Sequence, residues 1–145
     1  KYYILKNKKQ KKYGTIKSYY DDINHRIAEI AENLDQVIKK NNIKNIIFED
    51  IYLENNLMVF KHLALLLGVL INVAIKNKCN YTTINILEWK SYYNMEKLGN
   101  RDLGKTLSKK IVLENLGIDV IDDVSDSILI GYYLFNKNIV DSYDW

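Results

Sequence analysis

Three acidic residues stand where their side chains could take part in metal-ion chemistry, and two of them form a pair. Asp123 and Asp126 open a predicted helix, and residues three apart are neighbours on a helix surface. Two carboxylates in that arrangement suit a hard divalent cation, which prefers oxygen donors. The alternative is structural, because acids in a first helical turn stabilise the helix dipole without any metal. By itself the pair favours the structural role.

The third acid, Glu49, follows an apolar stretch, Ile46–Phe48. Three such residues suit a central strand that is buried on both faces, with Glu49 at its C-terminal end. Ligand sites in open α/β sheets collect at this end of the strands. A carboxylate there costs desolvation unless a cation or a hydrogen bond compensates. The alternative is that Glu49 only marks the place where the strand meets water.

A helix followed by a strand must position Glu49. Residues Asp21–Lys40 carry apolar side chains at helical spacing, and Asn41 and Asn42 end that helix. The strand Ile43–Phe48 follows directly, so the fold class is predicted to be α/β, a mixed sheet flanked by helices. Upstream, two short strands of a hairpin are predicted, over Tyr2–Leu5 and Tyr13–Ile16.

A long apolar helix is predicted over Val59–Lys78, after a loop over Tyr52–Met58. Its apolar residues cover more than one face, so it is either buried centrally or shared with a partner subunit. The face within Leu63–Ala74 is the candidate dimer interface, where Gly68 would let another backbone approach closely. The segment Tyr81–Ile86 favours a second strand, parallel to the first and reached through this crossover helix.

The C-terminal part of the chain is predicted to carry two more helices. Leu87–Arg101 is irregular and rich in aromatic and basic residues. A helix over Asp102–Asn115 follows, ended by Gly117, and another covers Val124–Phe135. There is no internal repeat and no linker, so residues 1–145 are predicted to form a single domain.

Composition sets broad limits on partners and compartment. The 21 basic and 18 acidic residues give a net charge of +3, which permits a polyanionic partner without requiring one. The one cysteine, Cys79, allows no internal disulfide and favours a reducing, cytoplasmic setting. The longest apolar run, Leu63–Ile71, is too short to span a membrane, so no membrane association is expected.

The order of these features resembles the RuvC family of Holliday-junction resolvases, within the ribonuclease H-like superfamily, over roughly residues 43–135. Glu49–Tyr52 resembles the family's strand-end Glu and the aromatic-bearing loop after it. Gly68-Val69 resembles the Gly-Val in the middle of the family's dimer helix. Asp123-x-x-Asp126, followed by Ser127–Ile130, resembles its terminal acid pair. The match is one of order and spacing rather than identity.

The resemblance implies a Mg²⁺-dependent endonuclease that acts as a homodimer and resolves four-way DNA junctions by paired symmetric nicks. Two Mg²⁺ ions, for which Mn²⁺ could substitute, would lie about 3.5–4 Å apart. The implied ligands are Glu49, Asp123 and Asp126, and Lys105 would neutralise the pentacovalent phosphate. The residues implied to contact DNA are Tyr52, Asn56, Lys90, Arg101 and Lys109.

Several alternatives stay open beside this interpretation. Tyr52 could instead lie in the core, and Lys109 could be an ordinary solvated residue. The family carries a further Asp on its first strand, but no Asp precedes Asp21 here, so we expect that strand to lie before Lys1. The alternative functions are a less selective flap or fork nuclease of the same superfamily, and a junction-binding protein that has lost catalysis.

Overall fold

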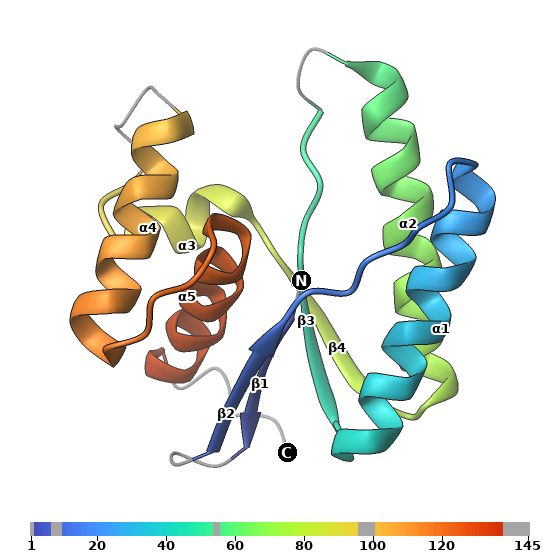
Figure 1. The fold of residues 1–145 in the computed structure, drawn as a ribbon, viewed down its shortest axis with the longest axis horizontal. Coiled ribbons are helices and arrows are strands. Elements are labelled where there is room, and N and C mark those ends of the chain that lie inside the picture. The colour runs from blue at the N-terminus through green and yellow to red at the C-terminus, as the bar shows by residue number, and fades with distance from the viewer. Residues whose placement is uncertain (1, 7–9, 54–55, 96–100, 138–145) are drawn as a thin grey trace. The chain divides into compact units, whose positions relative to one another are not determined.

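The computed structural model describes residues 2–6, 10–53, 56–95 and 101–137, which form five helices and four strands (Figure 1). The chain divides into two compact units. Unit 1 comprises Lys1–Thr15 and Leu87–Trp145, and unit 2 comprises Ile16–Ile86. The prediction of a single nuclease domain over residues 1–145 stays a prediction.

Unit 2 is an α/β unit built around two parallel strands. Its elements are α1 (Ile23–Asn41), β3 (Asn45–Glu49), α2 (Leu57–Lys76) and β4 (Asn80–Ile84). Asn45 of β3 lies opposite Asn80, and Glu49 lies opposite Ile84. The predicted parallel pairing through a crossover helix is therefore confirmed.

One prediction for β3 is wrong. Among the described residues β3 pairs only with β4, and residues Ile46–Phe48 are half-buried rather than buried on both faces. The described residues form one antiparallel and one parallel two-stranded sheet, so the predicted α/β class is confirmed, and the single mixed sheet stays a prediction. Packing against helices accounts for Ile46 and Phe48, which share a face because side chains alternate along a strand, whereas Ile47 belongs to the other face.

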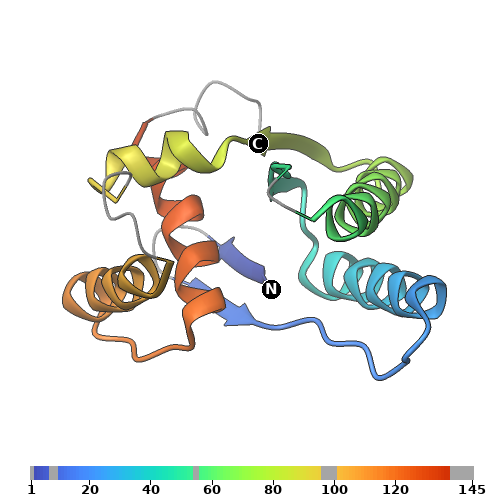
Figure 2. The ribbon, with the colours of Figure 1, turned by 90° about the horizontal axis from the view of Figure 1, so that it is seen from above.

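Helices α1 and α2 supply that packing. Leu34 and Ile38 of α1 and Val73 and Ala74 of α2 form a buried cluster, against which Ile46 and Phe48 of β3 pack. Figure 2 shows the two helices side by side. Because residues two apart on a strand share a face, both helices cover the same face of β3.

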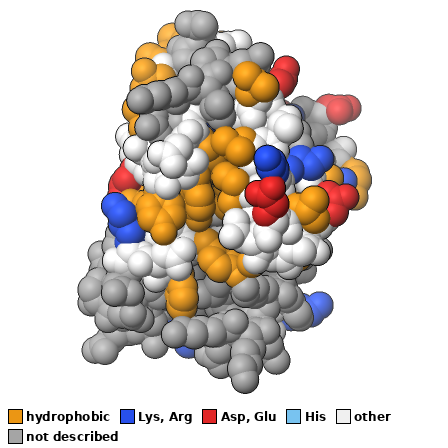
Figure 3. Space-filling model, turned by 90° about the vertical axis from the view of Figure 1, so that its left-hand side faces the viewer, with side chains coloured by type: hydrophobic (Ala, Val, Ile, Leu, Met, Phe, Trp, Pro, Cys, Tyr) orange, Lys and Arg blue, Asp and Glu red, His pale blue; other side chains and the backbone are white. Residues whose placement is uncertain are grey.

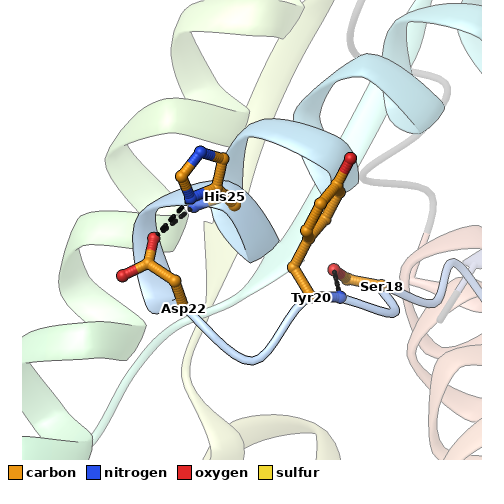
Figure 4. Close-up of polar contacts among 4 residues, drawn as sticks. All are labelled: Ser18, Tyr20, Asp22 and His25. Atoms are coloured by element: carbon orange, nitrogen blue, oxygen red, sulfur yellow. Dashed lines mark hydrogen bonds and ion pairs between the residues drawn. The ribbon is translucent and has the colours of Figure 1, made fainter.

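The start of α1 is fixed by a side-chain cap. The carboxylate of Asp22 accepts hydrogen bonds from the backbone N–H of His25 at 3.0 Å and from its Nδ1 at 2.8 Å (Figure 4). These bonds, the backbone one first, lower the pKa of Asp22. Just before the cap, the N–H of Tyr20 donates to Ser18 Oγ at 3.4 Å. At the other end Asn42 adopts a left-handed conformation, φ 50°, and ends the helix as predicted.

A polar clasp joins the C-terminal halves of α1 and α2. Asp35 accepts hydrogen bonds from Lys39 Nζ at 2.6 Å and from Asn77 Nδ2 at 2.7 Å. The bond from Lys39, and then that from Asn77, lowers the pKa of Asp35 below its ordinary 3.8. The clasp therefore stabilises the fold when Asp35 is ionised.

We expect Asp35→Asn to lower the melting temperature at pH 7. A group with a lowered folded-state pKa contributes stability above its unfolded pKa, and that contribution is lost as the pH falls through the folded value. The difference between parent and variant should therefore shrink as the pH drops below 3.8. Thermal unfolding followed by circular dichroism at pH 7 and in the acid range measures it. Glu32→Gln on the same helix is the control, and an equal loss of stability in both variants would refute the clasp.

Helix α2 begins two residues earlier than predicted, because Asn56 caps it. Asn56 Oδ1 accepts from the N–H groups of Met58 at 3.0 Å and Val59 at 3.1 Å. Of the α2 residues, only Val73 and Ala74 are buried. We define the outer stripe of α2 by its exposed residues at three- and four-residue spacing: Met58, Lys61, Leu65, Gly68, Asn72 and Ile75. Burial of this helix on all sides is therefore excluded.

The length of α2 also bears on the membrane prediction. It has 20 residues, a mean hydropathy of 2.1 over its most apolar 18-residue window, and 11% of that window buried. By length and composition alone it could cross a membrane, since it continues beyond the run Leu63–Ile71. A helix in the core of a water-soluble protein has the same length and composition. The absence of membrane association stays a prediction.

Unit 1 contains a hairpin and three helices. Its elements are β1 (Tyr2–Lys6), β2 (Gln10–Gly14), α3 (Ile86–Tyr92, of which Ile86 is the last residue of unit 2), α4 (Arg101–Leu116) and α5 (Asp122–Asn136). The antiparallel hairpin is confirmed, but its second strand is Gln10–Gly14 rather than Tyr13–Ile16, since Lys6 pairs with Gln10. Gly117 ends α4 as predicted: its φ is +66° and its N–H donates to Leu113 at 2.8 Å.

The prediction that Leu87–Arg101 is irregular is wrong in its first half, where α3 forms. The helix is anchored by Trp89, because the side chain of this residue is fully buried. Helices α4 and α5 pack on each other, with Val112, Val124 and Ile128 buried. Figure 3 shows hydrophobic side chains gathered on one face of the molecule. Leu103 and Leu113 of α4 are among the large hydrophobic residues left exposed.

Candidate metal and nucleic-acid site

Asp123 and Asp126 lie in the first turns of α5, as the sequence predicts. Both side chains are half-buried, and the Oδ1 atom of Asp126 is fully buried. The helix starts after Ile121, which makes no side-chain cap hydrogen bond. Because residues three apart are neighbours on a helix surface, the two carboxylates belong to the same side of α5. The first part of the predicted site is thus a pair of acids on one rigid element.

Glu49 is the last residue of β3, and its side chain is exposed. The pairing with β4 continues one residue further, because the Asp50 N–H donates to the Ile84 carbonyl at 2.8 Å. The side chain of Asp50 accepts from the N–H of Ile51 at 2.9 Å. Glu49 is therefore held at the C-terminal end of a paired strand, the position the sequence predicts.

Glu49 belongs to unit 2, whereas Asp123 and Asp126 belong to unit 1. Within either unit, the described residues contain no group of three or more His, Cys, Asp or Glu that could hold a metal ion. The donor chemistry of the three residues nevertheless fits Mg²⁺, because all their donors are carboxylate oxygens. The combination of the three acids in one site stays a prediction.

The predicted basic contacts lie on α3 and α4 of unit 1. Lys105 and Lys109 are four residues apart on α4, so they share a side of that helix, and both are half-buried. Lys90 of α3 holds its Nζ 5.5 Å from the centre of the Trp89 ring. Arg101 is the first residue of α4, and its side chain lies outside the described part of the chain.

The two other predicted DNA contacts are in unit 2. Tyr52 is 69% exposed, so the alternative that it belongs to the core is wrong, and its ring is available for stacking. Asn56 has a structural role that the prediction missed, as the cap of α2. The missed signal was an Asn directly before a long apolar run, which is typical of a helix start.

The contacts that hold α5 were also missed. Tyr93 donates a hydrogen bond to the carbonyl of Leu129 at 3.1 Å, and Tyr133 donates to the carboxylate of Glu88 at 2.6 Å. Each bond spans more than 35 residues of sequence. No local pattern marks such a pair, so only the structure reveals them.

Comparison with known proteins gives a match by structure alone. No family model matches the chain, and no curated protein matches it either. A Thermus thermophilus RuvC structure matches with a TM-score of 0.61 and 13% identity, covering 81% of this chain and 72% of that one. The fold of this chain resembles that of RuvC. The T. thermophilus RuvC in complex with a Holliday junction substrate matches with a TM-score of 0.59 and 10% identity, covering 81% and 73%.

At sequence identities of 13% and 10%, the likeness to RuvC concerns the fold alone. The resemblance first inferred from the order of residues is confirmed at that level. The RuvC match, 81% of 145 residues or about 117, is longer than the 93 residues of the segment 43–135. It therefore extends beyond the segment from which the resemblance was inferred.

Proposed function

We propose that this protein is a Mg²⁺-dependent, structure-specific endodeoxyribonuclease of ribonuclease H-like fold, which resolves Holliday junctions by paired symmetric nicks. The RuvC-like fold, matched over 81% of the chain, carries this proposal. One of the matching structures is a RuvC bound to a Holliday junction substrate, which supports branched DNA as the partner. The acids at the end of β3 and the start of α5 supply the chemistry.

The carboxylates of Glu49, Asp123 and Asp126 would hold Mg²⁺, which supplies an activated water and stabilises the leaving oxygen. The half-buried position of Asp123 and Asp126 limits the water around their carboxylates, which strengthens their attraction for a cation. Lys105, on the neighbouring helix α4, would offset the charge that develops on the phosphate.

DNA would be held by residues that read its backbone and its unpaired bases. Lys90, Arg101 and Lys109 would contact phosphates, which positions DNA without reading its sequence. The exposed ring of Tyr52 would stack on an unpaired base at the junction. Asn56 Oδ1 already caps α2, so its amide nitrogen would make the DNA contact.

A four-way junction has two-fold symmetry, and a symmetric dimer offers it two equivalent sites. The helix α2 would form the interface through its outer stripe, where Leu65 and Ile75 are 49% and 56% exposed. Gly68 lies in the middle of that stripe, and nothing stands within 4 Å of the place its side chain would occupy. A second α2 could therefore approach closely. A cytoplasmic location is part of this proposal.

A second candidate, a protein that binds junctions without cutting them, is favoured by one observation. The first-strand Asp of the RuvC family has no counterpart in β1 or β2, neither of which carries an acidic residue. The three acids would then serve the fold alone. A less selective nuclease of flaps and forks is the runner-up among enzymes.

Incubation of the full-length protein with synthetic DNA substrates and Mg²⁺ separates these functions. The substrates are a four-way junction, a flap, a fork and a linear duplex of matched sequence. We expect paired symmetric nicks in the junction alone. Equal cutting of flaps and forks would favour the less selective nuclease. Tight junction binding without cutting, in Mg²⁺ and in Mn²⁺, would favour the binding protein.

A further inference from the structure

Two residues, Glu88 of α3 and Tyr93 in the turn after it, form hydrogen bonds with one side of helix α5. The hydroxyl of Tyr93 donates to the carbonyl oxygen of Leu129 at 3.1 Å. The hydroxyl of Tyr133 donates to Oε1 of Glu88 at 2.6 Å. All four residues belong to unit 1. Two hydrogen bonds therefore tie α5 to the same neighbouring segment at two different heights.

These contacts lie on the side of α5 that carries Asp126. Leu129 and Tyr133 follow Asp126 by three and seven residues, and such residues share a side of a helix. At 1.5 Å per residue they lie about 4.5 and 10.5 Å further along the axis. These contacts are therefore within two turns of Asp126.

Aromatic packing supports the two tyrosines that form these hydrogen bonds. The ring of Tyr92 packs edge-on against Tyr93, with centres 4.9 Å apart, and against Tyr133, with centres 5.2 Å apart. Tyr133 is fully buried, and Lys137 Nζ lies 5.0 Å from the centre of its ring. Burial raises the pKa of Tyr93 and of Tyr133, so both hydroxyls stay protonated donors at neutral pH.

The N-terminal end of α5 is held by packing, since Val124 and Ser125 are buried. The residue before the helix, Ile121, makes no side-chain cap hydrogen bond. A single bond further along would still let the helix slide or turn, and one residue of rotation is about 100°. Bonds at both Leu129 and Tyr133 remove that freedom. The hydrogen bonds at Leu129 and Tyr133 therefore contribute to the orientation of Asp126.

We propose that Tyr93, Tyr133 and Glu88 are positioning residues, which fix the rotation and the height of α5 and thereby aim the carboxylates of Asp123 and Asp126. This inference rests on the proposed function, in which those carboxylates bind metal. The positioning residues themselves contact neither metal nor DNA.

The test compares variants that remove hydroxyl groups and keep the rings. The double variant Tyr93→Phe/Tyr133→Phe loses both bonds. Tyr92→Phe is the matched control, since Tyr92 packs on Tyr93 and Tyr133 through its ring, which the variant keeps. Binding of Mn²⁺ to the full-length protein without DNA is followed by electron paramagnetic resonance, and junction cutting is measured beside it. We expect the double variant to bind Mn²⁺ about tenfold more weakly, as for partners that orient metal ligands. The control should match the parent.

Glu88 provides a second comparison that does not depend on the buried rings. Glu88→Gln keeps an oxygen acceptor for Tyr133 and should retain parental Mn²⁺ affinity, whereas Glu88→Ala should lose affinity as the double variant does. Circular dichroism confirms that each variant is folded. Parental affinity in Glu88→Ala and in the double variant would overturn the inference and leave the proposed function standing. A parent protein that binds no Mn²⁺ would overturn both.

Discussion

Replacing Asp126 with Asn is expected to abolish junction cutting while leaving junction binding intact. Asn keeps the size of the side chain but removes its charge, so it is a poor ligand for a hard cation. Loss of a ligand should remove several kcal/mol of transition-state stabilisation, which corresponds to about a hundredfold or more in rate. Binding should persist, because DNA affinity comes mainly from contacts between basic residues and phosphates.

The control for this variant is Asp119→Asn, which removes the same charge from an exposed loop of the same unit. A parallel pair tests the other half of the site. Glu49→Gln should stop cutting, and Asp50→Asn, one residue later and also exposed, should not. Single-turnover cutting and gel-shift binding on a four-way junction measure both effects. Undiminished cutting by Asp126→Asn or by Glu49→Gln would remove that residue from the active site.

Leu65→Glu is expected to convert a dimer into monomers. Leu65 lies in the outer stripe of α2 and is 49% exposed in the single chain. Burying the rest of such a side chain contributes on the order of 1.5 kcal/mol, and symmetry places it in the interface twice. Two buried, unpaired carboxylates would add a further cost. The dissociation constant should therefore rise by about a hundredfold or more.

Leu113→Glu is a closely matched control, because Leu113 is 50% exposed on α4, outside the proposed interface. Sedimentation at micromolar concentration gives the mass of each protein. We expect a dimer for the parent and for Leu113→Glu, and a monomer for Leu65→Glu. A monomeric parent would exclude the α2 interface, and so would a dimeric Leu65→Glu.

Local features of the fold could be predicted from the sequence because their causes are local. Helical spacing and the turn at Asn42 define α1, and the apolar run before Glu49 places that residue at a strand end. Where a single distant contact determines the local structure, prediction from the sequence fails. Helix α3 exists because Trp89 is buried, and no periodicity within its seven residues could show that.

The features of the candidate site also differ in whether local spacing or a distant contact determines them. The acid pair on α5 follows from spacing within a single helix, so Asp123 and Asp126 were predicted in the right element. The hydrogen bond from Tyr93 to Leu129 joins residues 36 apart, and the sequence carries no sign of it. The capping role of Asn56 lies between these cases, because the pattern was present but was interpreted as a DNA contact alone.

Cys79 allows the rate at which unit 2 opens to be measured by thiol labelling. It is the only cysteine in the chain, it is buried in the cluster shared by α1 and α2, and its Sγ donates to the Ile43 carbonyl at 3.2 Å. Burial also raises the pKa of the thiol, which keeps it unreactive. A thiol reagent can therefore modify it only in molecules whose core has opened. The rate of labelling then reports how often the support beneath β3 opens under native conditions, in the natural sequence and without an introduced probe.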